Sequence, residues 1–185
     1  MPDMLREATE SDQEMIRRWR NHPKVRQASH TTHEIGEREH ARWWSGVRAD
    51  PARRVLIYES AGTPCGVVTF SEHDRVAGSA LWGFYFDLEG LWQRGGLPPA
   101  RAGLGPAALA YAFEVLGLAV VRGEVLADNA GSLRLHREYG FVETGREVRE
   151  TDGGPREVVQ VECVAADSDR GGASPAKPAR RGSDQ

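Results

Sequence analysis

The sequence has 185 residues, 39% of them hydrophobic and 28% charged, which suits one soluble globular domain with a sizeable core. Its formal net charge of -3 excludes a global attraction to nucleic acid or to an anionic membrane, and neither partner is expected. The two cysteines, Cys65 and Cys163, lie too far apart in the sequence for a metal cluster or a disulfide framework, so no metal is expected either.

The two ends of the chain carry different signals. The N-terminal residues lack the apolar run of a secretory signal, and the most apolar later segment is interrupted by Glu114 and Gly117 and is too short to span a bilayer. We therefore expect a cytoplasmic protein. Residues 167–185 contain no aromatic or large aliphatic side chain, which predicts a disordered tail after a single domain at residues 1–166.

Apolar periodicity predicts both helices and strands in the first half of the chain. A short strand at residues 4–9 precedes a helix, because Ile16 and Trp19 fall on one helical face. Asp12 is the expected N-cap of this helix, and Pro23 is expected to end it. The other elements of this half are expected at residues 34–47 (helix) and at 53–60, 65–72 and 79–87 (strands).

The second half alternates more regularly between helix and strand. Its most apolar helix is expected at residues 104–117, and the connection before it, residues 87–102, is unusually long. The remaining elements are expected at residues 120–128 (strand), 132–139 (helix), 141–150 and 156–164 (strands). This order predicts a mixed α/β or α+β fold, with helices on the faces of one sheet.

Two stretches have the composition of a binding site. In PARAGLGPAAL, Gly103 and Gly105 stand at the expected start of the apolar helix, where glycines and free N–H groups suit a pyrophosphate; an ordinary glycine-rich loop is the alternative. In DNAGSLRLHREYGF, Asn129 ends a strand and Ser132 starts a helix. His136 lies off the apolar face of that helix, and a partly exposed structural histidine is the alternative there.

The succession of these motifs over residues 4–165 resembles the GNAT superfamily of acetyl-CoA-dependent N-acetyltransferases. The resemblance implies a mixed, mostly antiparallel sheet that splays open between two parallel middle strands, with acetyl-CoA in the splay. It places the pyrophosphate on amides of the G-x-G turn, the pantetheine arm beside the strand-ending Asn, and a general acid at the position of His136. The implied cofactor-binding residues are Arg101, Ala102, Gly103, Leu104, Gly105, Asn129 and Ser132. Where the pyrophosphate loop of the superfamily usually has Gln or Arg, three residues before the first Gly, this sequence has Ala100. The neighbouring Arg101 is expected to serve in its place.

Three sequence segments narrow the resemblance to one group of enzymes within the superfamily. WRNHPKVR, EREHARWW and SALWGFYF resemble N-acetyltransferases of nucleotide-linked amino sugars, of the pseudaminic acid pathway type. The implied partner is a small-molecule amine, a nucleotide-diphosphate amino sugar, whose two negative charges suit nearby cations. The implied substrate-binding residues are Arg20, Asn21, Arg26, His40 and Trp82. The first phrase also occurs loosely in ribosomal-protein and polyamine acetyltransferases.

The sequence does not identify the residue that removes the proton from the acceptor amine. SALWGFYF contains no Asp or Glu, although several GNAT enzymes keep a carboxylate base on that strand. His40, His73 and Tyr85 are the remaining candidates for this base, beside His136 as the acid. The alternative functions are a protein N-terminal or polyamine acetyltransferase, and a non-catalytic acetyl-CoA sensor or interaction module. A homodimer is common in the superfamily and is possible here.

Overall fold

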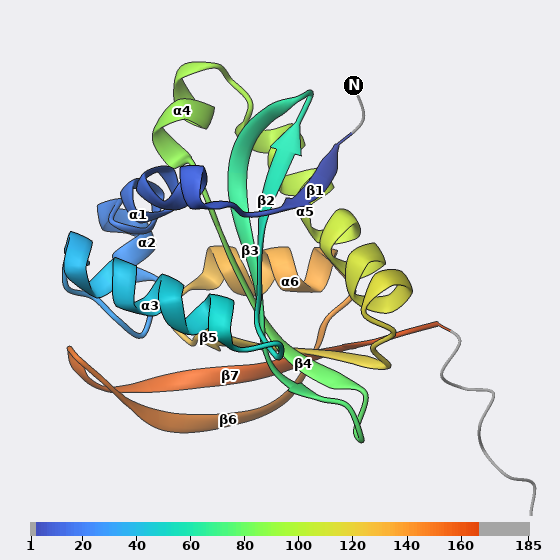
Figure 1. Ribbon diagram of the computed structural model, residues 1–185. Coiled ribbons are helices and arrows are strands. Elements are labelled where there is room, and N and C mark those ends of the chain that lie inside the picture. Colours follow the sequence, from blue (N-terminus) through green and yellow to red (C-terminus); the bar gives the residue numbers. More distant parts are fainter. Residues whose placement is uncertain (1–2, 167–185) are drawn as a thin grey trace, which may run out of the picture.

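The computed structural model describes residues 3–166, and the tail predicted at 167–185 lies outside this range. Figure 1 shows the arrangement of its helices and strands. In chain order these are β1 (Met4–Glu7), η1 (Glu10–Asp12), α1 (Gln13–Arg20), α2 (Pro23–Gln27), α3 (Glu37–Ala49), β2 (Arg54–Ser60), β3 (Thr63–Asp74), β4 (Ser79–Phe86), α4 (Leu88–Gln93), α5 (Leu97–Ala110), η2 (Tyr111–Val115), β5 (Val120–Leu126), α6 (Ala130–Glu138), β6 (Val142–Thr151) and β7 (Gly154–Val164).

The seven strands form one sheet in the order β1-β2-β3-β4-β5-β7-β6. The neighbouring pairs are antiparallel except β4 and β5, which are parallel. β4 and β5 pair only from Ser79↔Val120 to Trp82↔Gly123, and beyond this point the two strands separate. The predicted fold class, a mixed and mostly antiparallel sheet that opens between two parallel middle strands, is therefore confirmed.

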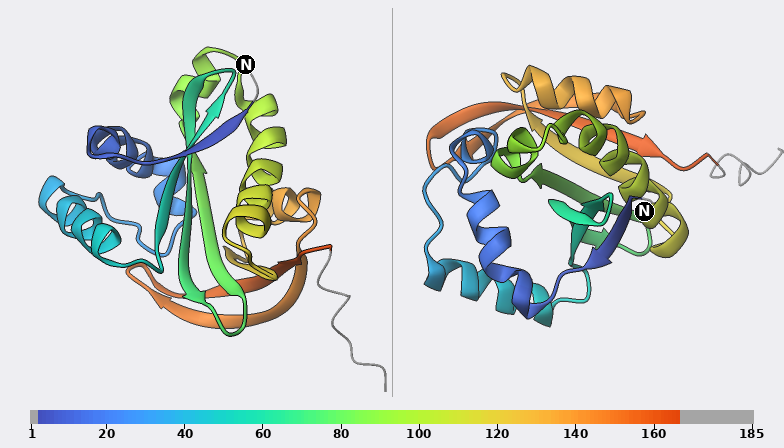
Figure 2. Two further views of the ribbon diagram at one scale, coloured as in Figure 1. Left: turned by 45° about the vertical axis from the view of Figure 1, so that its right-hand side comes forward. Right: turned by 90° about the horizontal axis from the view of Figure 1, so that it is seen from above.

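Helices cover both faces of the central strands. In Figure 2, α1 and α3 (blue to cyan) lie on one side of β2 and β3, and α5 (green to yellow) lies on the other. The side chains alternate accordingly: Leu56 and Val68 belong to the core under α5, and Ile57 and Val67 belong to the core under α1 and α3. All four side chains are fully buried. Because neither face of these two strands is exposed to solvent, their sequences are continuous apolar runs rather than alternating ones.

Prolines lie in the first turn of two helices, at positions where the sequence predicted the end of a helix or a loop. Pro23 does follow the end of α1, but it is also the first residue of α2, where its missing N–H costs little. The predicted start of the apolar helix at residue 104 is wrong, because α5 begins at Leu97 and holds Pro98 and Pro99 in its first turn. The long connection before it is therefore mostly helical and includes α4.

A buried carboxylate ties β1 to the turn before α1. Asp12 stands at the expected N-cap position, but its side chain turns back and accepts hydrogen bonds from Thr9 N at 2.8 Å and from Arg6 Nη1 and Nη2 at 2.8 and 2.9 Å. Arg6 also donates to Glu59 on β2 at 2.7 Å. The guanidinium of Arg6 and the N–H of Thr9 lower the pKa of Asp12 to about 2.

We predict that Asp12→Asn lowers the free energy of unfolding by about 1–3 kcal/mol at pH 7 and by much less at pH 2.5. The pKa of Asp12 in the folded chain lies below its ordinary value, so this stabilisation is complete above about pH 4 and is lost as the pH falls toward 2. Urea denaturation at both pH values measures it. Glu14→Gln, which removes an exposed partner of Arg17, is the control and should have little effect at either pH. An equal loss at both pH values for Asp12→Asn would contradict the prediction.

Candidate active site

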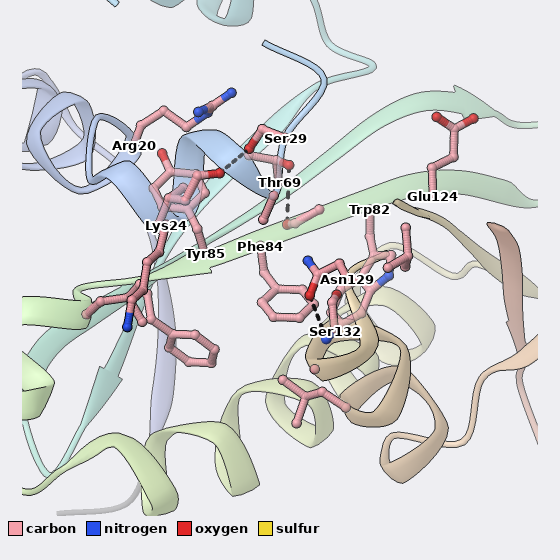
Figure 3. A pocket seen from close by; sticks show the side chains of 18 of the residues that line it. Arg20, Lys24, Ser29, Thr69, Trp82, Phe84, Tyr85, Glu124, Asn129 and Ser132 are labelled. Atoms are coloured by element: carbon pink, nitrogen blue, oxygen red, sulfur yellow. Dashed lines mark hydrogen bonds between the residues drawn. The ribbon is translucent and has the colours of Figure 1, made fainter. Parts of the chain in front are cut away.

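One cavity of about 1050 Å³ occupies the opening between β4 and β5. From Gly83 to Phe86, β4 has no strand partner on the β5 side, so its backbone edge borders this opening. The cavity is lined on one side by residues of α1, α3 and the segment between α2 and α3, and on the other by residues of α5 and α6. Figure 3 shows Arg20 and Tyr85 on the first side, Asn129 and Ser132 on the second, and Phe84 between them. The cavity therefore passes from one face of the sheet to the other.

The N-terminus of α6 forms the wall on the second side. Asn129 is its N-cap, and Oδ1 accepts the hydrogen bond from Ser132 N at 3.0 Å. Asx side chains at this position satisfy an amide that the helix itself cannot, which explains why the helix begins there. Both residues line the cavity, and their predicted role in cofactor binding stays a prediction.

His136 follows one turn later on α6 and is buried, not partly exposed. Nδ1 lies 2.8 Å from the carbonyl oxygen of Ser132, so Nδ1 carries the proton and donates it to that oxygen. The ring lies among Trp82, Phe84 and Phe141, at centroid distances of 5.4, 5.5 and 5.1 Å. Burial lowers the pKa of His136, because an imidazolium loses its hydration there.

This environment changes what His136 can do chemically. The ring is neutral at pH 7, and its one proton is held by the carbonyl of Ser132. A neutral imidazole of this tautomer can accept a proton or a hydrogen bond at Nε2, but it has no free proton to give. The general-acid role that the resemblance implies stays a prediction, and the geometry works against it.

The glycines of α5 have a different role from the one predicted. Residues 102–105 lie inside the helix rather than at its start, so their amides point along the helix axis to earlier carbonyls. A side chain at Gly103 would collide with Asp3 and the hydroxyl of Tyr58, and one at Gly105 would collide with the ring of Tyr139. The cofactor-binding role predicted for these glycines stays a prediction, and their place inside the helix does not favour it. They allow α5 to pack closely on its neighbours.

The start of α5 offers few free amides to an anion. Two of its first three residues, Pro98 and Pro99, have no N–H, and Ala100 N donates to Gly96 O at 3.1 Å. Arg101 and Ala102 line the cavity, whereas Gly103, Leu104 and Gly105 do not. The predicted cofactor-binding set is thus brought to the cavity in part.

The opposite wall of the cavity is charged. Arg20, the last residue of α1, donates from Nη2 to Thr31 O at 3.2 Å, while Nη1 is buried and has no hydrogen-bond partner within residues 3–166. Tyr85 lines the same wall, and burial raises the pKa of its hydroxyl. His40 is buried against Trp43 with ring centroids 5.1 Å apart, and burial lowers its pKa. Arg20 and His40 both line the cavity, and their predicted role in substrate binding stays a prediction.

Three further predicted residues do not line the cavity. Asn21 holds Ile35 through hydrogen bonds to its backbone N–H and carbonyl, at 2.8 and 2.9 Å, and so shapes the segment between α2 and α3. Arg26 lies on α2 but is not part of the lining, and His73 lies near the end of β3, where the register with β4 is broken. The structure therefore does not bring these three residues together with the others, and their direct roles stay predictions.

The structure adds a contact that no sequence pattern indicated. Asp152, in the turn between β6 and β7, accepts hydrogen bonds from Thr32 N, Thr32 Oγ1 and His33 Nδ1 at 2.7, 2.8 and 2.9 Å. These donors hold the pKa of Asp152 well below its usual range. His33 Nε2 lies 3.0 Å from Glu39, which lines the cavity. The β6–β7 hairpin thus fixes the segment 28–36, which forms part of the charged wall.

The comparisons with known proteins agree with this architecture. The model of the family described as "Acetyltransferase (GNAT) domain" matches residues 4–142, which is more than half of the chain. The chain belongs to the GNAT acetyltransferase family. It is accordingly an acetyl-CoA-dependent N-acetyltransferase, with acetyl-CoA as its co-substrate. The search of curated proteins gave no match.

Solved structures similar to this GNAT chain include three of spermidine N-acetyltransferases. The enzyme from Vibrio cholerae in complex with CoA and spermine has a TM-score of 0.74 and 23% identity, over 88% of this chain and 95% of that one. A chimera of Vibrio cholerae SpeG and hSSAT has a TM-score of 0.73 and 23% identity, over 89% and 96%. The Vibrio cholerae enzyme with manganese ions has a TM-score of 0.68 and 23% identity, over 88% and 92%. At these identities the similarity establishes the fold.

Two kinds of feature are absent from residues 3–166 of this GNAT chain. No group of three or more His, Cys, Asp or Glu side chains in this range could hold a metal ion. None of the helices in the same range is both long enough and apolar enough to cross a membrane.

We predict that Gly105→Ala lowers the free energy of unfolding by about 1–3 kcal/mol, because its new methyl group would push α6 away through the Tyr139 ring. Denaturant unfolding measures the effect. The control is Gly46→Ala in α3, where the nearest side-chain atom is 4.0 Å away. That variant should instead gain up to about 1 kcal/mol, since alanine favours an exposed helix over glycine. A Gly105→Ala variant as stable as the parent would show that the contact is not close in solution.

We predict that His136 is a neutral Nδ1–H tautomer at pH 7 and that its pKa lies below the ordinary histidine value of 6.5, because burial opposes its charged form. Two-bond ¹H–¹⁵N NMR correlations distinguish the two nitrogens and follow the titration. His33 is an internal control: hydrogen bonds from its ring to Asp152 and Glu39 raise its pKa, so it should titrate above 6.5. A doubly protonated His136 at pH 7 would restore the general-acid role.

Proposed function

We propose that this GNAT enzyme moves an acetyl group from acetyl-CoA, held on the α5 and α6 side, to a primary amine held on the α1 and α3 side. The observation that carries the proposal is the single cavity that crosses the sheet where β4 and β5 separate. Such a passage brings two ligands from opposite faces to one point, and this positioning supplies roughly 7–11 kcal/mol at best. The reaction is then direct attack by the amine on the thioester carbonyl.

The residues of α6 support binding of the donor. Asn129 and Ser132 present polar atoms to the cavity beside an apolar group of rings that includes Trp82 and Phe84. In this proposal the neutral His136 accepts a hydrogen bond from the cofactor at Nε2. The CoA thiolate leaves without an acid, since a thiol with a pKa near ~8.5 is a competent leaving group at neutral pH. Arg101 supplies a cation for the pyrophosphate.

The acceptor is proposed to carry an anionic group, as a nucleotide-linked amino sugar does. Arg20 is largely buried in the cavity wall, forms no salt bridge within the described part of the chain, and leaves Nη1 without a partner. A buried guanidinium stays charged and is stabilised by a phosphate or carboxylate that accepts two hydrogen bonds. Lys24 lines the same wall. Two cations facing one cavity favour an anionic acceptor.

A polyamine is the second candidate acceptor. The similar solved structures are of spermidine N-acetyltransferases, which makes this candidate the one that the comparisons favour. Glu39 and Glu124 also line the cavity, and carboxylates are what a polycation requires. The two candidates differ in the sign of the charge that the cavity must recognise, so one experiment separates them.

We predict that a nucleotide-diphosphate amino sugar is acetylated with a kcat/KM at least ~10² above that of spermidine. Arg20→Gln should lower this kcat/KM by at least ~10-fold and leave the kcat/KM for spermidine unchanged. Release of the CoA thiol measures both rates. The control is Arg18→Gln, which changes an exposed arginine of α1 outside the cavity. Faster turnover of spermidine, with Arg20→Gln neutral or faster still, would identify the polyamine as the acceptor instead.

A further inference from the structure

One carboxylate of the β6–β7 turn holds the middle of the segment 28–36. Asp152 accepts hydrogen bonds from Thr32 N at 2.7 Å, Thr32 Oγ1 at 2.8 Å and His33 N at 3.1 Å. An exposed ion pair alone contributes little, but here two consecutive backbone N–H groups and a hydroxyl bind one carboxylate. The turn has its own hydrogen bonds, because the Thr151 hydroxyl binds backbone groups of the two glycines that follow, at 3.2 and 2.7 Å. Asp152 therefore acts on the segment rather than on its own turn.

His33 joins this carboxylate to a second one on α3. Its Nδ1 lies 2.9 Å from Asp152, and its Nε2 lies 3.0 Å from Glu39. A ring with a carboxylate at each nitrogen donates to both only as an imidazolium, since a neutral ring has one N–H. Both carboxylates raise the pKa of His33, and Arg20 of α1 is the cation that the same two carboxylates attract. We call Glu39, His33 and Asp152 the clamp.

The segment that the clamp holds also holds Arg20. Arg20 Nη2 donates to the carbonyl oxygen of Thr31 at 3.2 Å, and Thr31 comes directly before Thr32. Arg20 and Thr31 line the cavity, whereas Thr32, His33 and Asp152 do not. Because the guanidinium is planar and rigid, fixing Nη2 also fixes the direction of Nη1, which is buried without a partner within residues 3–166. The clamp thus reaches the cavity through one backbone carbonyl.

Two contacts outside the clamp hold the ends of the segment. Asn21 binds the backbone N–H and carbonyl of Ile35, and Arg156 Nη1 on β7 donates to Gln27 O at 3.1 Å. Figure 1 shows the turn of the β6–β7 hairpin close to the chain that joins α2 to α3. Loss of the clamp would therefore release the middle of the segment while its ends stay attached.

We propose that Asp152 and His33 are positioning residues that keep Arg20 directed at the acceptor. The proposal rests on the proposed function, in which Arg20 binds an anionic group of the acceptor. The hold is complete while His33 is an imidazolium. Because the clamp raises the pKa of His33, its contribution is fully present below the ordinary value of 6.5 and is lost as the pH rises through the raised value.

The first test is Asp152→Asn, which keeps the shape of the side chain and removes its charge. We expect the KM of the amino-sugar nucleotide to rise about 10-fold at pH 6.5, because the apparent affinity falls with the fraction of molecules whose segment is in place. The kcat and the KM of acetyl-CoA should change less than about twofold. In the Arg20→Gln background Asp152→Asn should raise the KM by less than about twofold, since the clamp acts through Arg20.

The second test is the pH dependence of acceptor affinity, with UDP-glucose as a nucleotide-diphosphate sugar that has no amine to titrate. Its Kd for the parent should rise at least about threefold from pH 6 to pH 9, and should stay constant for His33→Asn, whose amide does not titrate. NMR titration of the free protein gives a further readout. Asp152→Asn should lower the pKa of His33 toward 6.5, because one of its two carboxylates is gone.

The matched control is Glu150→Gln, which removes an exposed carboxylate of the same hairpin outside the cavity lining. It should keep the KM and the pH dependence of the parent. If Asp152→Asn does not fold, His33→Asn carries the KM measurement and its cycle with Arg20→Gln. The proposal is overturned if the KM of Asp152→Asn stays within about twofold of the parent, if its rise is equally large in the Arg20→Gln background, or if the pKa of His33 does not fall.

Failure of this proposal is distinguishable from failure of the proposed function. A parent enzyme that neither binds UDP-glucose nor acetylates the amino-sugar nucleotide contradicts the proposed acceptor, and the NMR titration of His33 still decides whether the clamp exists. An active parent with an unchanged KM in Asp152→Asn contradicts only the clamp.

Discussion

The active site depends on how the Trp82 indole packs against Gly123 at the last pair of β4 and β5. A side chain at residue 123 would place its first carbon 2.9 Å from Trp82 Nε1 and 3.0 Å from Val161, so only glycine fits beside the indole. The indole also stacks on Phe141, with centroids 5.0 Å apart and planes at 10°. The ring fills the space between the strands at the point where pairing stops, and the cavity begins beyond it.

The two sides of this opening differ in polarity because different parts of the chain build them. The α6 side is a group of rings around a neutral histidine, which suits an acyl thioester and its apolar arm. The α1 and α3 side contains Arg20 together with Glu39, which suits a charged acceptor. In the proposed function, an apolar donor side and a charged acceptor side meet where β4 and β5 separate.

Much of the fold could be predicted from the sequence, because apolar runs and their order determine which strands are buried and which helices cover them. The start of α5 could not, since Pro98 and Pro99 are typical of loops but are equally compatible with a first helical turn. Asn129, Ser132 and His136 could be assigned to one helix and its start because a local motif contains all three. The place of Glu124 at the opening could not be predicted, since it comes from strand register and no spacing within β5 shows where β4 leaves it.

The family model ends at residue 142, whereas the hairpin that closes the charged wall follows it. Arg149, which fixes Glu124, and Asp152, which fixes Thr32 and His33, both lie beyond that limit. Arg20 and Glu39, which line the charged wall, lie inside the matched region, whereas the hairpin that holds Thr32 and His33 lies outside it. The shared region therefore contains both walls of the cavity, but not all of the contacts that hold the charged wall in place.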